Sequence, residues 1–92
     1  MIRFHYHYAP LNQPRLRIRR GDWLCHVFSD LPDLDAAERE LLAWGRRFGP
    51  PNLRLQRRGD RRQHYDLWGA WLAICGPAAP REAVRAWLRP GT

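Results

Sequence analysis

The chain has 92 residues, a length typical of one domain, over residues 1–92. Its formal net charge of +7 at pH 7 favours polyanionic partners. All 16 basic residues are arginine, whose planar guanidinium binds phosphates or carboxylates in a bidentate manner. The longest apolar run, from Leu67 to Cys75, is far shorter than the ~20 residues that cross a bilayer, so we expect no membrane partner.

The two cysteines, Cys25 and Cys75, stand in no C-x-x-C pair and have no zinc-finger spacing. A disulfide-stabilised domain of this size would normally contain more cysteines, so both are predicted to be reduced core residues. The first residues form no continuous apolar run of the kind found in a secretory signal. We therefore expect the protein to be cytoplasmic.

The first elements are predicted to be strands. Apolar side chains alternate with arginine and histidine from residue 2 to residue 8, which indicates a strand with one apolar face. Alternation resumes at Leu16 and Ile18, and Gly21-Asp22 suits a type II′ turn into a return strand over residues 23–28. The sequence thus predicts a hairpin centred on this turn.

A helix is predicted over residues 35–48. Asp35 and Glu38 have the spacing of a capping box, and Gly49 with two prolines ends the segment. Its apolar stripe recurs every three or four residues: Leu34, Ala37, Leu41, Trp44 and Phe48. We expect Leu41, Trp44 and Phe48 to be buried against the hairpin.

Two more helices are predicted after a short strand around residues 53–55. Asp66 is interpreted as the N-cap of a helix that extends to Cys75, and Pro80 opens a last short helix. The expected fold class is α+β, with a small and mostly antiparallel sheet and two to three helices packed on one face.

Several short motifs occur in a characteristic order: Trp23-Leu-Cys-His26 leading to Ser29-Asp30, then His64-Tyr65-Asp66, then Arg81-Glu82. This order resembles the DUF4031 family of small bacterial and phage proteins of unknown function, over nearly the whole chain. The first strand departs from that pattern, because His5-Tyr6-His7 stands where similar proteins often carry aspartates. The resemblance implies a fold and supplies no activity.

Histidine and aspartate are the candidates for chemistry. His5 and His7 share one face of the first strand, a spacing that allows two imidazoles to bind one metal ion. His64 and Asp66 have the spacing of an orienting pair, and with His26 they form a candidate catalytic set. Wet-face histidines and a helix-capping Asp66 explain the same pattern without chemistry.

Arginine-rich turns are the other candidates, and they carry the function that we favour from the sequence. Phosphate contacts are predicted from two groups of side chains, Arg17, Arg19 and Arg20 in the first and Arg57, Arg58, Arg61 and Arg62 in the second. We expect binding of nucleic acid or another polyanion, and tyrosine and tryptophan side chains are available for base stacking. Two alternatives remain open: a small metal-dependent or acid–base enzyme that uses His26, His64 and Asp66, and an interaction module for an acidic protein. No particular cofactor is predicted.

Overall fold

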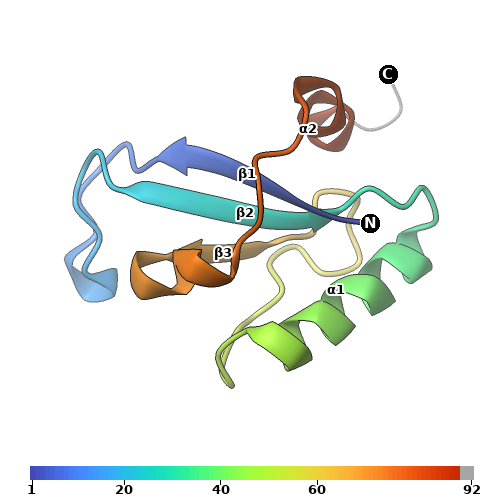
Figure 1. Cartoon of the computed structure of the whole chain (residues 1–92), viewed down its shortest axis with the longest axis horizontal. Helices are drawn as coiled ribbons and strands as arrows, with labels where there is room; N and C mark the ends of the chain where they lie inside the picture. Colours follow the sequence, from blue (N-terminus) through green and yellow to red (C-terminus); the bar gives the residue numbers. More distant parts are fainter. Residues whose placement is uncertain (90–92) are drawn as a thin grey trace.

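The computed structural model describes residues 1–89, and its centre is a three-stranded antiparallel sheet in the order β1-β2-β3 (Figure 1). The strands are Ile2–Tyr8 (β1), Trp23–Ser29 (β2) and Tyr65–Trp68 (β3). The alternating pattern of the first segment therefore does form a strand, as predicted. The antiparallel arrangement that we expected is also confirmed.

β2 pairs with β1 along its whole length, from Ile2 opposite Ser29 to Tyr8 opposite Trp23. The predicted hairpin at Gly21-Asp22 is therefore wrong. Residues 9–22 instead form a loop that contains η1 (Pro14–Leu16), a short 3-10 helix. The loop has its own backbone hydrogen bonds, and the side chain of Ile18 is buried within it.

α1 extends from Leu34 to Phe48, one residue longer at its start than predicted. Its N-cap is Asp33, whose side chain accepts a hydrogen bond from the Ala36 amide at 2.9 Å. The capping box predicted at Asp35 and Glu38 is therefore wrong, because the N-cap lies two residues earlier. An extended Asp33 already satisfies an amide of the first turn, and Asp35 lies inside that turn.

α1 and the 3-10 helix η2 (Gly69–Ile74) cover one face of the sheet. Leu41 is fully buried there, while Phe48 at the helix end is 44% exposed and corrects the prediction that it is a core residue. The cluster of buried side chains on this face comprises Cys25, Val27, Leu41, Tyr65 and Leu67. Trp44 is partly buried and packs against the cluster.

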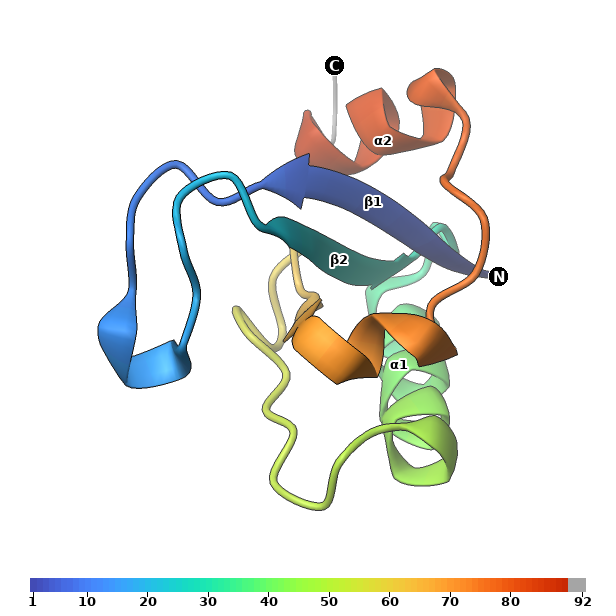
Figure 2. The same cartoon turned by 60° about the vertical axis from the view of Figure 1, so that its left-hand side comes forward.

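α2 (Arg81–Leu88) lies on the opposite face of the sheet from α1, which Figure 2 shows most clearly. The chain reaches that side along the outer edge of β1, where the Ala79 amide donates to the carbonyl of Phe4 at 2.8 Å. Trp87 is the buried residue of α2. The α+β class is thus confirmed, whereas the helices cover both faces rather than one.

Asp66 is not a helix cap, because it lies inside β3 opposite His26 of β2. The predicted helix from Asp66 to Cys75 is therefore replaced by a strand followed by η2. The predicted strand around residues 53–55 reduces to an isolated bridge between Gln56 and His64. None of the helices described in residues 1–89 is long and apolar enough to cross a membrane.

Cys25 and Cys75 are both free thiols, as predicted. Cys25 lies on the buried face of β2, and Cys75 follows η2. The neighbouring Cys75 thiol and the burial of Cys25 raise the pKa of Cys25. This thiol therefore stays protonated at neutral pH and belongs to the core.

Candidate metal site

The register of the sheet gathers imidazoles and a carboxylate on the face that α2 covers. His5 of β1 lies opposite His26 of β2, and His26 lies opposite Asp66 of β3. His7 is two residues beyond His5 and therefore points to the same face. Three strands that are far apart in the sequence thus contribute to one cluster.

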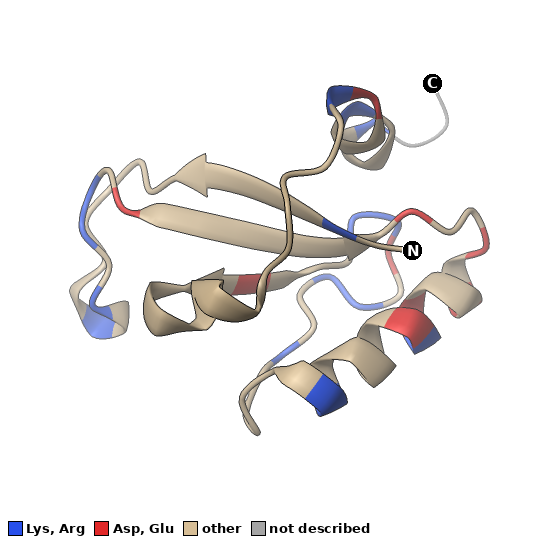
Figure 3. Ribbon diagram, viewed as in Figure 1, with Lys and Arg blue, Asp and Glu red and all other residues tan. Residues whose placement is uncertain are grey.

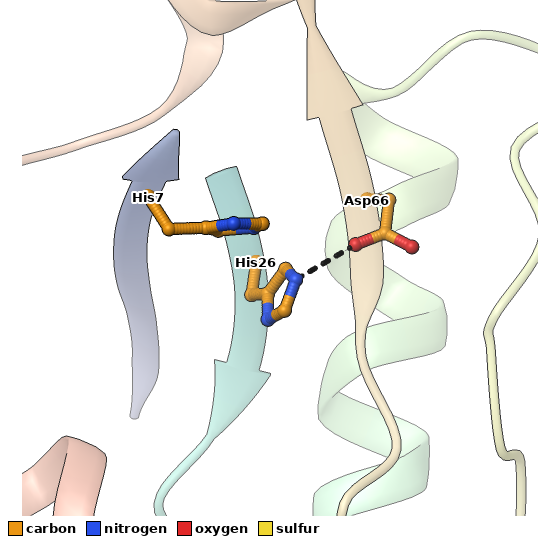
Figure 4. Close-up of side chains that lie close together, drawn as sticks. All are labelled: His7, His26 and Asp66. Carbon is orange, nitrogen blue, oxygen red and sulfur yellow. Dashed lines mark ion pairs between the residues drawn. The ribbon is translucent and has the colours of Figure 1, made fainter. Parts of the chain in front are cut away.

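His7, His26 and Asp66 form the tightest part of this cluster (Figure 4). One potential ligand atom from each of the three side chains lies within 4.8 Å of the others. The His26 Nε2 atom is 3.2 Å from Asp66 Oδ1, and the His7 and His26 ring centroids are 4.1 Å apart. His5 lies further out, with its ring centroid 5.7 Å from that of His26.

His64 contacts the same carboxylate from the residue before β3. Its Nδ1 is 2.8 Å from the carbonyl oxygen of Arg62, and its Nε2 is 3.5 Å from Asp66 Oδ1. Because a carbonyl and a carboxylate both only accept, these contacts favour a hydrogen on each ring nitrogen. Burial would lower the pKa of His64, but the hydrogen bonds to Asp66 and to the Arg62 carbonyl outweigh it and raise the pKa. A backbone carbonyl on one ring nitrogen fixes the orientation of the imidazole.

The electrostatics of the cluster favour a neutral His26 and an ionised Asp66. Burial lowers the pKa of His26 to about 4, although the neighbouring Asp66 acts in the opposite direction. Burial alone would raise the pKa of Asp66, but the imidazoles of His64 and His26 outweigh it and lower the pKa below its usual value. At neutral pH these are the forms that bind metal ions.

Trp87 of α2 packs over the His26 and His64 side of the cluster. Its ring stacks on Phe28 at 4.5 Å between centroids and lies 5.5 Å from the rings of both His26 and His64. The indole Nε1 of Trp87 is buried without a hydrogen-bond partner among the described residues. The same is true of one ring nitrogen each of His5, His7 and His26.

Four such atoms in one cluster are unusual, because nearly all buried polar atoms in proteins have a partner. The described part of the chain has no other buried side-chain nitrogen or oxygen atom in this condition. The donor set also fits a metal ion. Two ligands of a tetrahedral zinc ion are about 3.3 Å apart; the His26 and Asp66 atoms are 3.2 Å apart, and with the His7 atom the set lies within 4.8 Å.

The structure therefore brings together the candidate residues that the sequence divided into two sets. His5 and His7 were predicted as one metal pair, and His26, His64 and Asp66 as a separate catalytic set. Trp87, whose ring packs over the His26 and His64 imidazoles, was not predicted from the sequence to contribute to the site. No local pattern predicts this position, because it depends on the passage of the chain around β1.

The arginine turns, by contrast, lie at opposite ends of the sheet (Figure 3). The first turn belongs to residues 9–22, which connect Tyr8 to Trp23 at one end of the sheet. The second turn belongs to the loop before His64, beside the other end of β2. There the Arg61 side chain donates a hydrogen bond to the Pro32 carbonyl. In that second loop Arg57 pairs with Asp60, and Arg58 pairs with Glu38. The two turns therefore do not form one common surface.

Comparisons with protein-family profiles, with curated proteins and with solved structures find no match to this chain. The resemblance to the DUF4031 family accordingly stays a prediction, and the geometry of the site carries the functional argument.

Proposed function

We propose that this protein binds one divalent transition-metal ion, such as zinc or ferrous iron, through His7, His26 and Asp66. The observation that carries the proposal is the convergence of two imidazoles and a carboxylate within 4.8 Å, beside ring nitrogens that lack a partner among the described residues. Two histidines and one carboxylate are a ligand set of catalytic zinc and of non-haem iron.

The proposed site is catalytic in type rather than structural. Structural zinc sites use four protein ligands, whereas three ligands leave a position for a substrate or water. A divalent ion held by His7, His26 and Asp66 would supply a Lewis acid that can polarise a carbonyl or phosphoryl oxygen. The chain itself contributes Trp87, whose ring packs over His26 and His64, and the His64–Asp66 contact orients the carboxylate.

An acid–base centre without metal uses the same residues and is the second candidate. The observation that favours it is the His26–Asp66 contact of 3.2 Å together with the His26 Nδ1, which has no partner among the described residues. In that arrangement Asp66 accepts a hydrogen bond from the His26 Nε2–H group, and Nδ1 serves as the base. Stoichiometric metal binding separates the two candidates.

A cytoplasmic location suits both, since two free thiols persist in a reducing compartment.

The test is a titration of chelator-treated protein with Zn²⁺, Co²⁺ and anaerobic Fe²⁺ by calorimetry, with Co²⁺ absorption as a report on the ligands. We expect one ion per chain. Loss of a residue that hydrogen-bonds to a metal ligand typically weakens metal binding by about 10- to 100-fold. We expect this effect for His64→Ala, because His64 contacts the proposed ligand Asp66. Loss of a ligand should weaken binding further, in His26→Ala and in Asp66→Asn.

Asp35→Asn is the matched control, because it removes an exposed carboxylate from the first turn of α1. This variant should bind metal like the parent protein. The proposal is wrong if the parent protein binds no ion, or if Asp35→Asn and Asp66→Asn affect the affinity equally. In that case the acid–base candidate remains, and the ¹⁵N chemical shifts of His26 should then show a neutral imidazole near pH 7.

A further inference from the structure

Loop 9–22, which we call the arginine loop, carries a cluster of unneutralised positive charge. Its four arginines are all exposed: Arg15, Arg17, Arg19 and Arg20. Within the described residues, none of these side chains has an ion pair or a hydrogen bond. Asp22 is the single carboxylate of the loop, and it accepts a hydrogen bond from the Arg19 backbone amide. The loop therefore presents a strongly positive local surface.

The arginine loop is held in shape by contacts of its own. The Ala9 amide donates to the Asp22 carbonyl at 2.9 Å, and the Arg20 amide donates to the Asn12 side chain at 2.8 Å. Ile18 is only 4% exposed, so an apolar side chain anchors the loop between its arginines. A preorganised loop loses less conformational entropy on binding than a disordered one does.

Two exposed aromatic rings flank the arginine loop where it joins the sheet. Tyr8 ends β1 and Trp23 begins β2, and their ring centroids are 3.9 Å apart at an interplanar angle of 31°. Tyr8 is 58% exposed and Trp23 is 48% exposed. Such a cross-strand pair stabilises the ends of the two strands. The exposed surface of its two rings, which we call the aromatic platform, is available for stacking.

We infer that this end of the sheet, formed by the arginine loop and the Tyr8–Trp23 pair, binds single-stranded nucleic acid. Proteins that bind single strands combine a positive surface along the backbone with aromatic rings on which bases stack. Both elements are adjacent here, because the rings are the two residues that border the loop. The exposed rings favour a strand with unstacked bases over an acidic peptide, which has no planar groups to place on them. The inference is independent of the metal site, which lies on the sheet face beneath α2.

The structure supplies a matched control at the other end of the sheet. Arg17 and Arg57 are the two non-glycine residues with positive φ in the described chain, at 56° and 52°. Replacing either by asparagine removes a charge and keeps a residue that tolerates this conformation. The test variant is Arg17→Asn with Arg19→Gln and Arg20→Gln. The control variant is Arg57→Asn with Arg58→Gln and Arg61→Gln.

Fluorescence anisotropy should be measured with labelled oligothymidylate, oligouridylate, a DNA duplex and an oligoglutamate, across a salt series. Log K for single strands falls by about 0.7 per neutralised phosphate for each unit of log salt. The test variant should therefore bind more weakly, with a salt slope smaller by about two, and the control variant should bind like the parent protein. Equal losses in the two variants would overturn the inference, because net charge alone would then explain binding.

The aromatic platform is tested by Trp23→Leu, with Phe48→Leu as its control. Phe48 is 44% exposed at the end of α1, with the Arg47 guanidinium 5.3 Å from its ring centre. Loss of one stacking ring should weaken binding of the single strands by roughly 10- to 100-fold and leave duplex binding unchanged. Unchanged single-strand affinity in Trp23→Leu, or oligoglutamate binding as tight as that of the oligonucleotides, would overturn the inference. Asp66→Asn should retain full affinity, so failure of the metal proposal would not affect this result.

Discussion

Gly45→Ala is a substitution for which helix propensity and packing predict opposite results. Gly45 lies within α1 and is buried. Alanine in place of an interior helical glycine usually stabilises a protein by about 0.5–1 kcal/mol. A Cβ at position 45, however, would lie 2.4 Å from the Tyr65 hydroxyl oxygen and 2.7 Å from the ring carbon that bears it.

Tyr65 cannot move away without cost. It is 3% exposed, and its hydroxyl donates a hydrogen bond to the Leu41 carbonyl at 3.0 Å. Overpacking by one methyl group costs about 1–3 kcal/mol, and loss of the hydrogen bond costs about 0.5–1.5 kcal/mol. The cost exceeds the gain in propensity. We therefore expect Gly45→Ala to lower the free energy of unfolding by about 1–3 kcal/mol.

Urea denaturation followed by circular dichroism measures this difference directly. Ala43→Gly is the control, because it changes an exposed position of the same helix in the reverse sense and should cost about 0.5–1 kcal/mol. If Gly45→Ala stabilises the protein by the amount that propensity predicts, α1 and β3 do not approach each other as closely as described, and the reasoning is refuted.

Three further predictions concern the core, the thiols and the pH dependence of stability. Leu41→Ala should lower the free energy of unfolding by about 2–5 kcal/mol in the same assay, since Leu41 is fully buried; an unchanged value would contradict its place in the core. Thiol titration of the unfolded, unreduced protein should find both Cys25 and Cys75 free, and a result of none would reveal a disulfide. Burial would raise the pKa of Asp30, but the N-terminal amine and Arg3 outweigh it and lower the pKa. The stabilisation by Asp30 is therefore present above the unfolded pKa of about 4 and lost as the pH falls through the lower folded pKa, so Asp30→Asn should destabilise the protein near pH 7, and the difference should shrink as the pH is lowered below about 4.

The sequence predicted those elements whose signals are local. α1 was found within one residue of its start, because its apolar stripe and its glycine–proline end are encoded in adjacent turns. The prediction of a hairpin was wrong although Gly21-Asp22 is a good turn sequence. β1 offers β2 a longer pairing, which places Phe4 opposite Val27. Pairing over seven residues with a shared apolar face outweighs a favourable turn.

The residues of the candidate site were predicted from the sequence, but their position in one cluster was not. His5 and His7 share a face by strand periodicity alone. Their meeting with His26 and Asp66 requires the order of the strands, which no local pattern contains. Leu67 and Trp68 resembled a helical stripe, and a strand of four residues is too short for alternation to distinguish it from a helix.

The passage of the chain along β1 also determines how molecules of this protein can associate. An uncovered edge strand presents free amides and carbonyls that attract strands of other chains. Here the segment before α2 bridges to Phe4 and occupies part of the outer edge of β1. Within the described sheet, β3 is the other edge, and it is only four residues long. The same crossing that carries Trp87 over the imidazoles therefore blocks intermolecular β-pairing along the part of the longer edge around Phe4.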